Sequence, residues 1–255
     1  LRERLAAADY REVINFSFVE PRWEADFAGE TDPIRLLNPI AGPLSVMRTT
    51  LIGSLVDVLR KNQNRKLERI RVFELGRVFL RDPAAVAGAL SVPGVRQPMR
   101  IAAAAYGPAL DEQWGERARG VDFFDVKADL ESLVAPKAAR FEPRSHPALH
   151  PGRSARVFLE GAPAGWLGEL HPRWQQKYDL PRPAVLFELD TDPLVTVPLP
   201  QPAVPSRFPP VVRDIAVVLP ESVLAQATLD LMQAKKPAIV QQLTIFDLYQ
   251  GQNLP

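Results

Sequence analysis

The sequence predicts an α+β protein, in which an antiparallel sheet with flanking helices is followed by a smaller βαβ unit. Several short segments alternate apolar and polar side chains with the period of a half-buried strand. Segments with helical periodicity lie between groups of these strands, which is typical of this class. A dense run of prolines near residue 200 divides the chain. We therefore expect a core domain over residues 1–197, a linker over residues 198–210 and a second domain over residues 211–255.

The first 35 residues predict a helix, a strand and a loop. Leu1 to Asp9 has a helical composition, with Leu1 and Leu5 on one side. Glu12 to Val19 alternates almost strictly, and this pattern predicts one continuous strand. A polar stretch over residues 21–33, with a proline at each end, predicts a loop.

The stretch from Leu36 to Phe79 predicts a turn, a long amphipathic helix and a strand, and the remaining segments can be placed around it. Asn38-Pro39 indicates the turn, because proline disfavours helical backbone in the residue before it. Either Thr49 or Thr50 can cap the helix. Its apolar stripe follows at helical spacing through Leu51, Leu55, Val58 and Leu59.

Two residues of this stretch require a tertiary explanation. Gly53 lies inside the predicted helix, where glycine costs about 1 kcal/mol relative to alanine, so it indicates close approach of another backbone. Glu74 lies in the predicted strand Ile70 to Leu80, on the same face as Val72. If that face is buried, the carboxylate needs a partner.

The pattern after residue 82 predicts a surface loop up to residue 98, and then further strands and helices. A helix capped by Asp125 is expected to continue to Val134, and a short helix is expected around Trp174 to Tyr178. A β-hairpin is expected around the loop at residues 160–164. The predicted strands in this part are Arg100–Tyr106, Gly120–Phe124, Gly152–Leu159, Gly165–Leu170 and Val185–Leu189.

A second unit is predicted after the linker, in which seven prolines fall between Pro193 and Pro210 and favour extended chain. Residues 211–219 and 239–249 read as strands. A helix capped by Ser222 is expected to end at Lys235. This βαβ unit of 45 residues is too short for a complete core of its own.

Composition limits the classes of function. The formal charge of +1 excludes a strongly basic coating for nucleic acid, although it permits a local patch. There is no cysteine, and no apolar run approaches the roughly 18 residues that cross a bilayer, so we expect a cytoplasmic protein without membrane contact. The chain begins at Leu1 without an initiator methionine, which we interpret as a piece of a longer protein.

Three polar clusters have both a functional and a structural interpretation. His146 and His150 have a metal-like spacing, but Pro147 between them breaks the helix that such a site needs, so we expect a turn and no metal. The acids at 125, 129 and 131 fall on different helix faces and predict a cap and a solvated surface. The basic run after the central helix fits either RNA phosphates or a solvated helix end: Arg60, Lys61, Arg65, Lys66, Arg69 and Arg71.

Several motifs, in their order and spacing, resemble one family along almost the whole chain. They are Tyr10–Phe18, Leu37–Pro39, Ser45–Leu51, Arg65, Arg71–Phe79, Asp122–Glu131, His150–Ala155 and Arg213–Val218. The chain resembles the bacterial phenylalanyl-tRNA synthetase β chain family. This resemblance implies a class II aminoacyl-tRNA synthetase-like core, followed by the first part of a ferredoxin-fold anticodon-binding domain. It also implies an α2β2 assembly with a catalytic α chain, which attaches phenylalanine to its tRNA with ATP and Mg²⁺.

Within this resemblance we assign no catalytic residue and no cofactor to this chain itself. Catalytic class II members place an arginine and then an acid after the strand that ends near Phe79, to hold the α-phosphate. Here Leu80 takes the place of the arginine, with Arg81-Asp82 displaced by one. The expected glycine-rich segment has no match around residues 186–194. The editing function of the family lies upstream of this piece.

The resemblance also implies where partners would bind. The central helix and its turn would form a subunit interface, through Asn38, Pro39, Met47, Arg48, Thr49, Leu51 and Leu55. The alternative is that the same apolar stripe is covered within this chain. In the second domain tRNA would contact Arg213, Lys235 and Lys236. A stand-alone tRNA-binding adaptor without a ligase role is the alternative function.

Overall fold

The computed structural model describes residues 1–88, 91–196, 207–249 and 251. Its internal contacts divide the chain into Leu1–Leu199 and Pro200–Pro255, and each unit is described by itself below. Most of the predicted linker, residues 198–206, lies outside the described residues.

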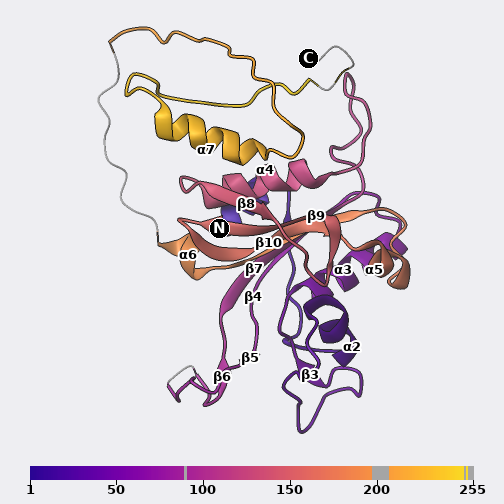
Figure 1. The fold of residues 1–255 in the computed structure, drawn as a ribbon. Coiled ribbons are helices and arrows are strands. Elements are labelled where there is room, and N and C mark those ends of the chain that lie inside the picture. Colours follow the sequence, from indigo (N-terminus) through magenta and orange to yellow (C-terminus); the bar gives the residue numbers. More distant parts are fainter. Residues whose placement is uncertain (89–90, 197–206, 250, 252–255) are drawn as a thin grey trace. The chain divides into compact units, whose positions relative to one another are not determined.

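The larger unit is built on a seven-stranded sheet with the order β1-β4-β7-β11-β10-β9-β8 (Figure 1). The pairs from β4 to β8 are antiparallel, as predicted, but β1 pairs with β4 in parallel, so the sheet is mixed. The strands are β1 (Arg11–Glu12), β4 (Ile70–Arg77), β7 (Met99–Tyr106), β8 (Ala139–Pro143), β9 (Leu149–Leu159), β10 (Ala162–Leu170) and β11 (Ala184–Asp190).

Helices cover both faces of this sheet (Figure 1), and strand β7 shows how the two faces are packed. Ala102, Ala104 and Tyr106 belong to the core under the central helix α3 (Ile52–Asn64). Ile101, Ala103 and Ala105 belong to the core on the other face, with α1 (Arg2–Ala7) and α4 (Phe123–Val134). Because alanine side chains are small, α3 approaches the sheet closely at this strand.

The central helix confirms the predicted stripe, since Leu51, Leu55 and Leu59 are fully buried and Val58 packs half-buried beside them. The explanation predicted for Gly53 is corrected in one respect. A Cβ at Gly53 would lie 3.1 Å from the Cβ of Trp23 and 3.2 Å from the ring of Phe27, so side chains rather than a backbone approach it. These aromatics come from the short helices α2 (Pro21–Trp23) and η1 (Glu24–Ala28), in the stretch predicted as a loop.

The continuous strand predicted over residues 12–19 is wrong. The chain leaves the large sheet after β1 and pairs again as β2 (Phe18–Val19) with β3 (Val46–Met47), in a separate two-stranded sheet. Between the two strands Ile14 is 92% exposed and Phe16 is 62% exposed. The alternation therefore spans two sheets, which periodicity alone does not distinguish.

The predicted hairpin is confirmed by β9 and β10. It is closed by Glu160 and Gly161, which both have positive φ, as in a type I′ turn.

The residue predicted to cap α4 was Asp125, and the structure shows that the cap is Asp122. Asp122 accepts the N–H groups of Phe124 and Asp125, and Asp125 accepts the N–H of Asp122 in return, so no strand extends to residue 124. The remaining elements are β5 (Leu80–Arg81), β6 (Val95–Arg96), α5 (Pro172–Lys177) and α6 (Asp192–Val195).

The smaller unit contains the helix α7 (Ala225–Lys235), which begins three residues after the predicted cap Ser222. The two strands predicted around it are not paired in the structure, which assigns no strand to the described residues of this unit. A strand forms only when a neighbour completes its ladder, and here Val212 and Ile215 are 77% and 69% exposed. In the described parts of the whole chain, no helix is long and apolar enough to cross a bilayer.

Candidate functional site

A row of residues crosses the sheet on the face covered by α3. Arg156 on β9 is directly opposite Trp166 on β10, which is opposite Glu188 on β11. The row continues through Ala102 on β7 to Glu74 on β4. Directly opposite residues of paired strands point to the same face, so two carboxylates flank one small alanine there.

The first carboxylate of the row, Glu74, has the partner that its position requires. Arg48 donates to Glu74 Oε1 at 2.6 Å, Asn15 donates to Oε2 at 2.8 Å, and both members of the ion pair are buried. Gly76 makes room for this arrangement, because a Cβ there would collide with Arg48 Nη2. The prediction that Glu74 needs a partner is thus confirmed, and Arg48 is the partner.

The residues after Arg48 are also held by buried acids. Glu24 accepts the backbone N–H of Thr49 at 2.8 Å and also binds its hydroxyl. Burial raises the pKa of Glu24 to about 7, although the hydrogen bonds from Thr49 oppose this effect. Glu188 accepts the Thr50 hydroxyl at 3.0 Å and the Leu51 N–H at 2.6 Å, and Thr50 Oγ1 accepts the Ile52 N–H at 3.2 Å. The start of α3 is therefore capped by Thr50 and by a carboxylate from the sheet.

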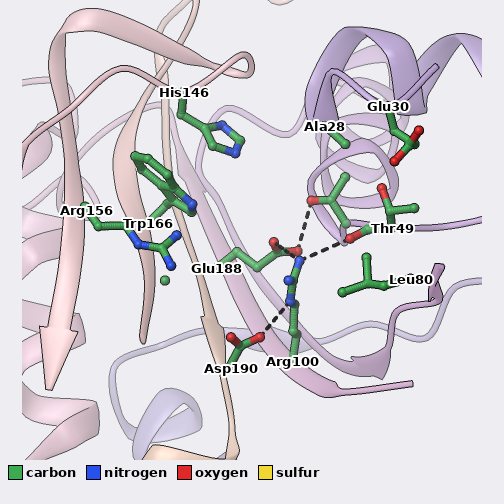
Figure 2. Close-up of a pocket in the computed structure, with 12 residues that line it drawn as sticks. Ala28, Glu30, Thr49, Leu80, Arg100, His146, Arg156, Trp166, Glu188 and Asp190 are labelled. Carbon is green, nitrogen blue, oxygen red and sulfur yellow. Dashed lines mark hydrogen bonds and ion pairs between the residues drawn. The ribbon is translucent and has the colours of Figure 1, made fainter. Parts of the chain in front are cut away.

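A pocket of about 240 Å³ opens beside this capped helix start (Figure 2). Strands β7, β9, β10 and β11 supply its floor and one wall, and the segments around residues 28–30 and 49–50 supply the opposite wall. Its lining residues are Ala28, Glu30, Thr49, Thr50, Leu80, Arg100, His146, Arg156, Gly165, Trp166, Glu188 and Asp190.

The charged groups at the floor of the pocket are paired with one another, one guanidinium with two carboxylates. Arg100 donates to Glu188 and to Asp190, both at 2.8 Å, and to the carbonyl of Thr49 at 3.1 Å. These carboxylates raise the pKa of Arg100 despite its burial, so the guanidinium stays charged. Its hydrogen-bonding capacity is largely used within the chain.

Leu80 lies in the lining of this pocket, and Arg81 does not. The Arg81 side chain is 57% exposed and forms an ion pair with Asp32 at 3.2 Å. Strand β5 therefore presents an aliphatic side chain to the pocket. An aliphatic group cannot hold a phosphate by charge.

The third part of the pocket is formed by aromatic and basic side chains. The Arg156 guanidinium lies 4.7 Å from the centre of the Trp166 ring, and the His146 ring lies 4.7 Å from the same centre. Burial, with smaller contributions from Arg156 and Arg100, lowers the pKa of His146 to about 4, so its ring is neutral at pH 7.

The structure separates the predicted interface residues into two groups. Arg48, Thr49, Leu51 and Leu55 are 8% exposed or less and are covered within this chain, as the alternative interpretation expected. Asn38 and Pro39 are exposed, and Met47 is half-buried. The exposed pair lies in a loop beside Leu37 and Ile40, which are 97% and 77% exposed.

The predicted tRNA contacts are available on the smaller unit. Lys235 and Lys236 lie at the end of α7, where Lys235 is exposed and Lys236 is half-buried with its Nζ 3.4 Å from the carbonyl of Gln241. Arg213 is exposed and contacts the carbonyl of Val212.

The other polar clusters are engaged in ion pairs. Asp57 binds both Arg60 and Lys61, so this part of the basic run is a helix surface. Farther along the same run, Arg69 pairs with Asp9 and Arg71 with Asp129. Asp125 pairs with Arg119, and Glu131 with Lys127. Within the described ranges, no group of three or more His, Asp or Glu side chains could hold a metal ion.

Sequence reasoning missed most of the pocket. Glu188 offered a signal, since it is one acid inside the otherwise apolar run Ala184 to Leu189 and is 5% exposed in the structure. Arg100 and Arg156 gave none, and His146 was noted only for its spacing from His150, because the meeting of these residues depends on the strand order.

Comparison with solved structures identifies the class of the fold. The chain is similar to a pyrrolysyl-tRNA synthetase from Desulfitobacterium hafniense, with a TM-score of 0.55 and 12% identity over 76% of this chain and 63% of that one. The larger unit thus has the mixed sheet of a class II aminoacyl-tRNA synthetase core, at an identity that shows the fold alone.

Sequence comparison then identifies the family. Residues 1–191 match the phenylalanyl tRNA synthetase beta chain CLM domain, and residues 206–255 match the ferredoxin-fold anticodon binding domain. The chain belongs to the phenylalanyl-tRNA synthetase β-chain family.

Individual relatives agree with this assignment. The phenylalanine–tRNA ligase β subunit of Burkholderia lata is 57% identical over 99% of this chain, and that of Dechloromonas aromatica is 48% identical over all of it. This chain spans 32% of the length of each of these relatives.

Proposed function

We propose that this chain is part of the β subunit of a cytoplasmic phenylalanine–tRNA ligase, in which it serves as a non-catalytic scaffold. In this proposal residues 1–197 bind the α chain of an α2β2 assembly, residues 198–210 are a linker, and residues 211–255 contribute to binding phenylalanine tRNA. The whole enzyme would use ATP and Mg²⁺ to attach phenylalanine, and the adenylation chemistry would belong to the α chain.

The pocket lining is the observation that carries the non-catalytic role. Transfer of an adenylyl group needs cations that hold the phosphates and stabilise developing charge. Leu80 presents no charge to the pocket, and Arg100 is bound to two carboxylates. We expect the chain alone to show no exchange of pyrophosphate into ATP.

The interface proposal rests on exposed apolar side chains near the predicted turn. Ile14, Phe16, Leu37 and Ile40 are each more than 60% exposed, and we call them the apolar edge. Both segments lead away from β3, because β2 pairs with β3 and the N–H of Met47 donates to the carbonyl of Ile34. Large exposed apolar side chains are typical of protein interfaces.

Replacing Leu37 and Ile40 together with aspartate is expected to weaken binding to the α chain by about 30-fold or more, the factor that 2 kcal/mol at an interface gives. Complex formation is measured by light scattering, and aminoacylation of phenylalanine tRNA is measured on the same samples. The matched control is Val86→Asp with Val92→Asp, which are 78% and 54% exposed on a different loop. Full binding by the Leu37 and Ile40 variant would place the interface elsewhere.

The tRNA proposal rests on the match to an anticodon-binding domain and on three of the cations of the smaller unit, Arg213, Lys235 and Lys236. Substituting Arg213, Lys235 and Lys236 with glutamine should flatten the salt dependence of tRNA affinity, because each phosphate that is no longer neutralised reduces the slope by up to about one. Lys61, which is paired with Asp57 on α3, provides the control substitution. An unchanged slope would assign these cations to the solvated surface.

The same samples distinguish the scaffold role from the alternative function, a stand-alone tRNA-binding adaptor. An adaptor would bind phenylalanine tRNA equally well with or without the α chain and would add nothing to aminoacylation. We expect the opposite result, in which aminoacylation requires the complex.

A further inference from the structure

A second pocket, of about 180 Å³, opens at the other end of α3 from the pocket described above. Helix α3 has 13 residues and is therefore about 20 Å long. The first pocket lies beside its start, whereas the second is lined by Gln63 in its last turn. The two pockets are thus separate places on the larger unit.

Three strand ends bring the second pocket together. Tyr106 ends β7, and the neighbouring strands begin directly opposite it, β4 with Ile70 and β11 with Ala184. The segments that lead into these two strands carry Glu68 and Arg182, which line the pocket together with Tyr106. Burial raises the pKa of Tyr106, and the charge of Arg182 opposes this effect, so the guanidinium lies near the phenol oxygen.

Helix α3 ends in a Schellman motif, in which a lysine takes the position that glycine usually holds. The N–H of Leu67 donates to the carbonyl of Asn62 at 3.2 Å, and that of Lys66 donates to the carbonyl of Gln63 at 2.8 Å. These two bonds occupy carbonyls at the helix end that would otherwise repel an anion. Lys66 has a φ of 68°, in the left-handed region, and strained positions of this kind occur preferentially at functional sites.

The two cations that line this pocket are available to a ligand. Four of the six cations of the basic run after α3 are held in ion pairs. Among the residues that the structure describes, Lys66 forms no ion pair, and neither does Arg182. Of the described lining residues only Glu68 is acidic, so the net charge of the lining is positive. An anion is therefore favoured here.

The remaining lining residues indicate what kind of anion fits. Leu67, which is 48% exposed, and Pro181 add apolar surface to the lining. A phosphate ester combines a negatively charged head, which two cations can bind, with an organic group that apolar side chains can contact. Since Lys66 and Arg182 are both exposed, the phosphate could belong to a free nucleotide or to a strand of RNA.

We propose that the pocket at the end of α3 binds a phosphate ester, with its oxygen atoms on Lys66 and Arg182 and its organic group against Leu67 and Pro181. No bond is made or broken in this proposal, so the site is one of binding. It uses none of the residues that the proposed function assigns to the α chain or to phenylalanine tRNA.

The test is a titration of the isotopically labelled 255-residue chain, followed by the NMR signals of the Lys66 and Leu67 backbone N–H groups. The probes are inorganic phosphate, uridine monophosphate and a short oligouridylate, with uridine as the uncharged control. We expect saturable shifts with all three phosphate probes and none with uridine. Binding about tenfold tighter for the oligonucleotide than for the monophosphate would identify RNA as the source of the phosphate, and equal affinity would identify a free nucleotide.

Variants, followed at the Leu67 signal, separate binding from stability. Lys66→Gly removes the charge but places the preferred residue at the left-handed position. We expect it to weaken binding of uridine monophosphate about tenfold or more, with a midpoint of thermal unfolding equal to or above that of the parent chain. Arg182→Gln should weaken binding similarly, whereas Glu68→Gln should strengthen it about threefold, because it removes a repulsive charge. The matched control is Lys61→Gln, whose 63% exposed side chain pairs with Asp57 on the same helix.

Three outcomes would overturn the proposal: no shift at Lys66 with about 50 mM uridine monophosphate, undiminished binding by Lys66→Gly, or equally weakened binding in Lys61→Gln and Lys66→Gly. The signals of Lys235 and Lys236 are followed in the same spectra. Oligonucleotide shifts there without shifts at Lys66 would contradict this site and leave the tRNA proposal standing. The scaffold proposal is tested separately, by complex formation with the α chain.

Discussion

Arg48→Met is expected to lower the free energy of unfolding of the larger unit by about 3–5 kcal/mol, the cost of leaving a buried carboxylate without its cation. Glu74 is 3% exposed, and it would keep only the contact from Asn15. Arg48 also donates to the carbonyl of Arg77 at 2.9 Å, which would lose its partner. Urea denaturation followed by circular dichroism measures the difference.

Two further variants show whether the cost comes from the unpaired charge. Arg140→Met removes an exposed arginine and should change stability by less than about 0.5 kcal/mol. Glu74→Leu introduced into the Arg48→Met chain should recover part of the stability, because it removes the buried charge itself. A double variant less stable than Arg48→Met alone would contradict this explanation.

Glu188→Ala is expected to lower the free energy of unfolding by about 3 kcal/mol or more. Glu188 binds the Leu51 N–H, the Thr50 hydroxyl and Arg100, and all three lose this acceptor together. Since the Leu51 N–H lies at the start of α3, we also expect faster hydrogen exchange at that amide. Both quantities can be measured on one labelled sample.

The matched control for this prediction is Glu142→Ala, a glutamate on β8 whose side chain is 51% exposed. It should leave both the stability and the Leu51 exchange rate near the parent values. Glu188→Gln keeps the size of the side chain but not its charge. Its free energy of unfolding should lie between those of the parent chain and the alanine variant. If the alanine variant retained slow exchange at Leu51, another group would be the acceptor at the helix start.

Arg48, Thr49 and Leu51 connect these two predictions with the proposed interface. All three side chains are buried in this chain, so we expect substitutions there to affect α binding through the fold, whereas substitutions at the exposed Leu37 and Ile40 are expected to act directly. An interface study should therefore report stability beside affinity for each variant.

The sequence alone determined the elements with strong local signals. The spacing of Leu51, Leu55 and Leu59 predicted α3, and the turn around Gly161 predicted the hairpin. The position of Glu74 on a buried face predicted that it has a partner. Several motifs that are each weak alone were together sufficient to indicate the family, because their order and spacing along the chain also have to agree.

Only the tertiary structure decided which groups meet. Periodicity reports that a face is buried but not which element covers it, so Arg48 and Leu51 fitted an interface as well as they fitted a core. Strands β1 and β2 belong to two different sheets, although a single alternating pattern runs through both of them. The position of the break between them was therefore not visible in the sequence. The pocket joins residues that are far apart in the chain, and its assembly follows from strand order and cross-strand register, which local sequence does not encode.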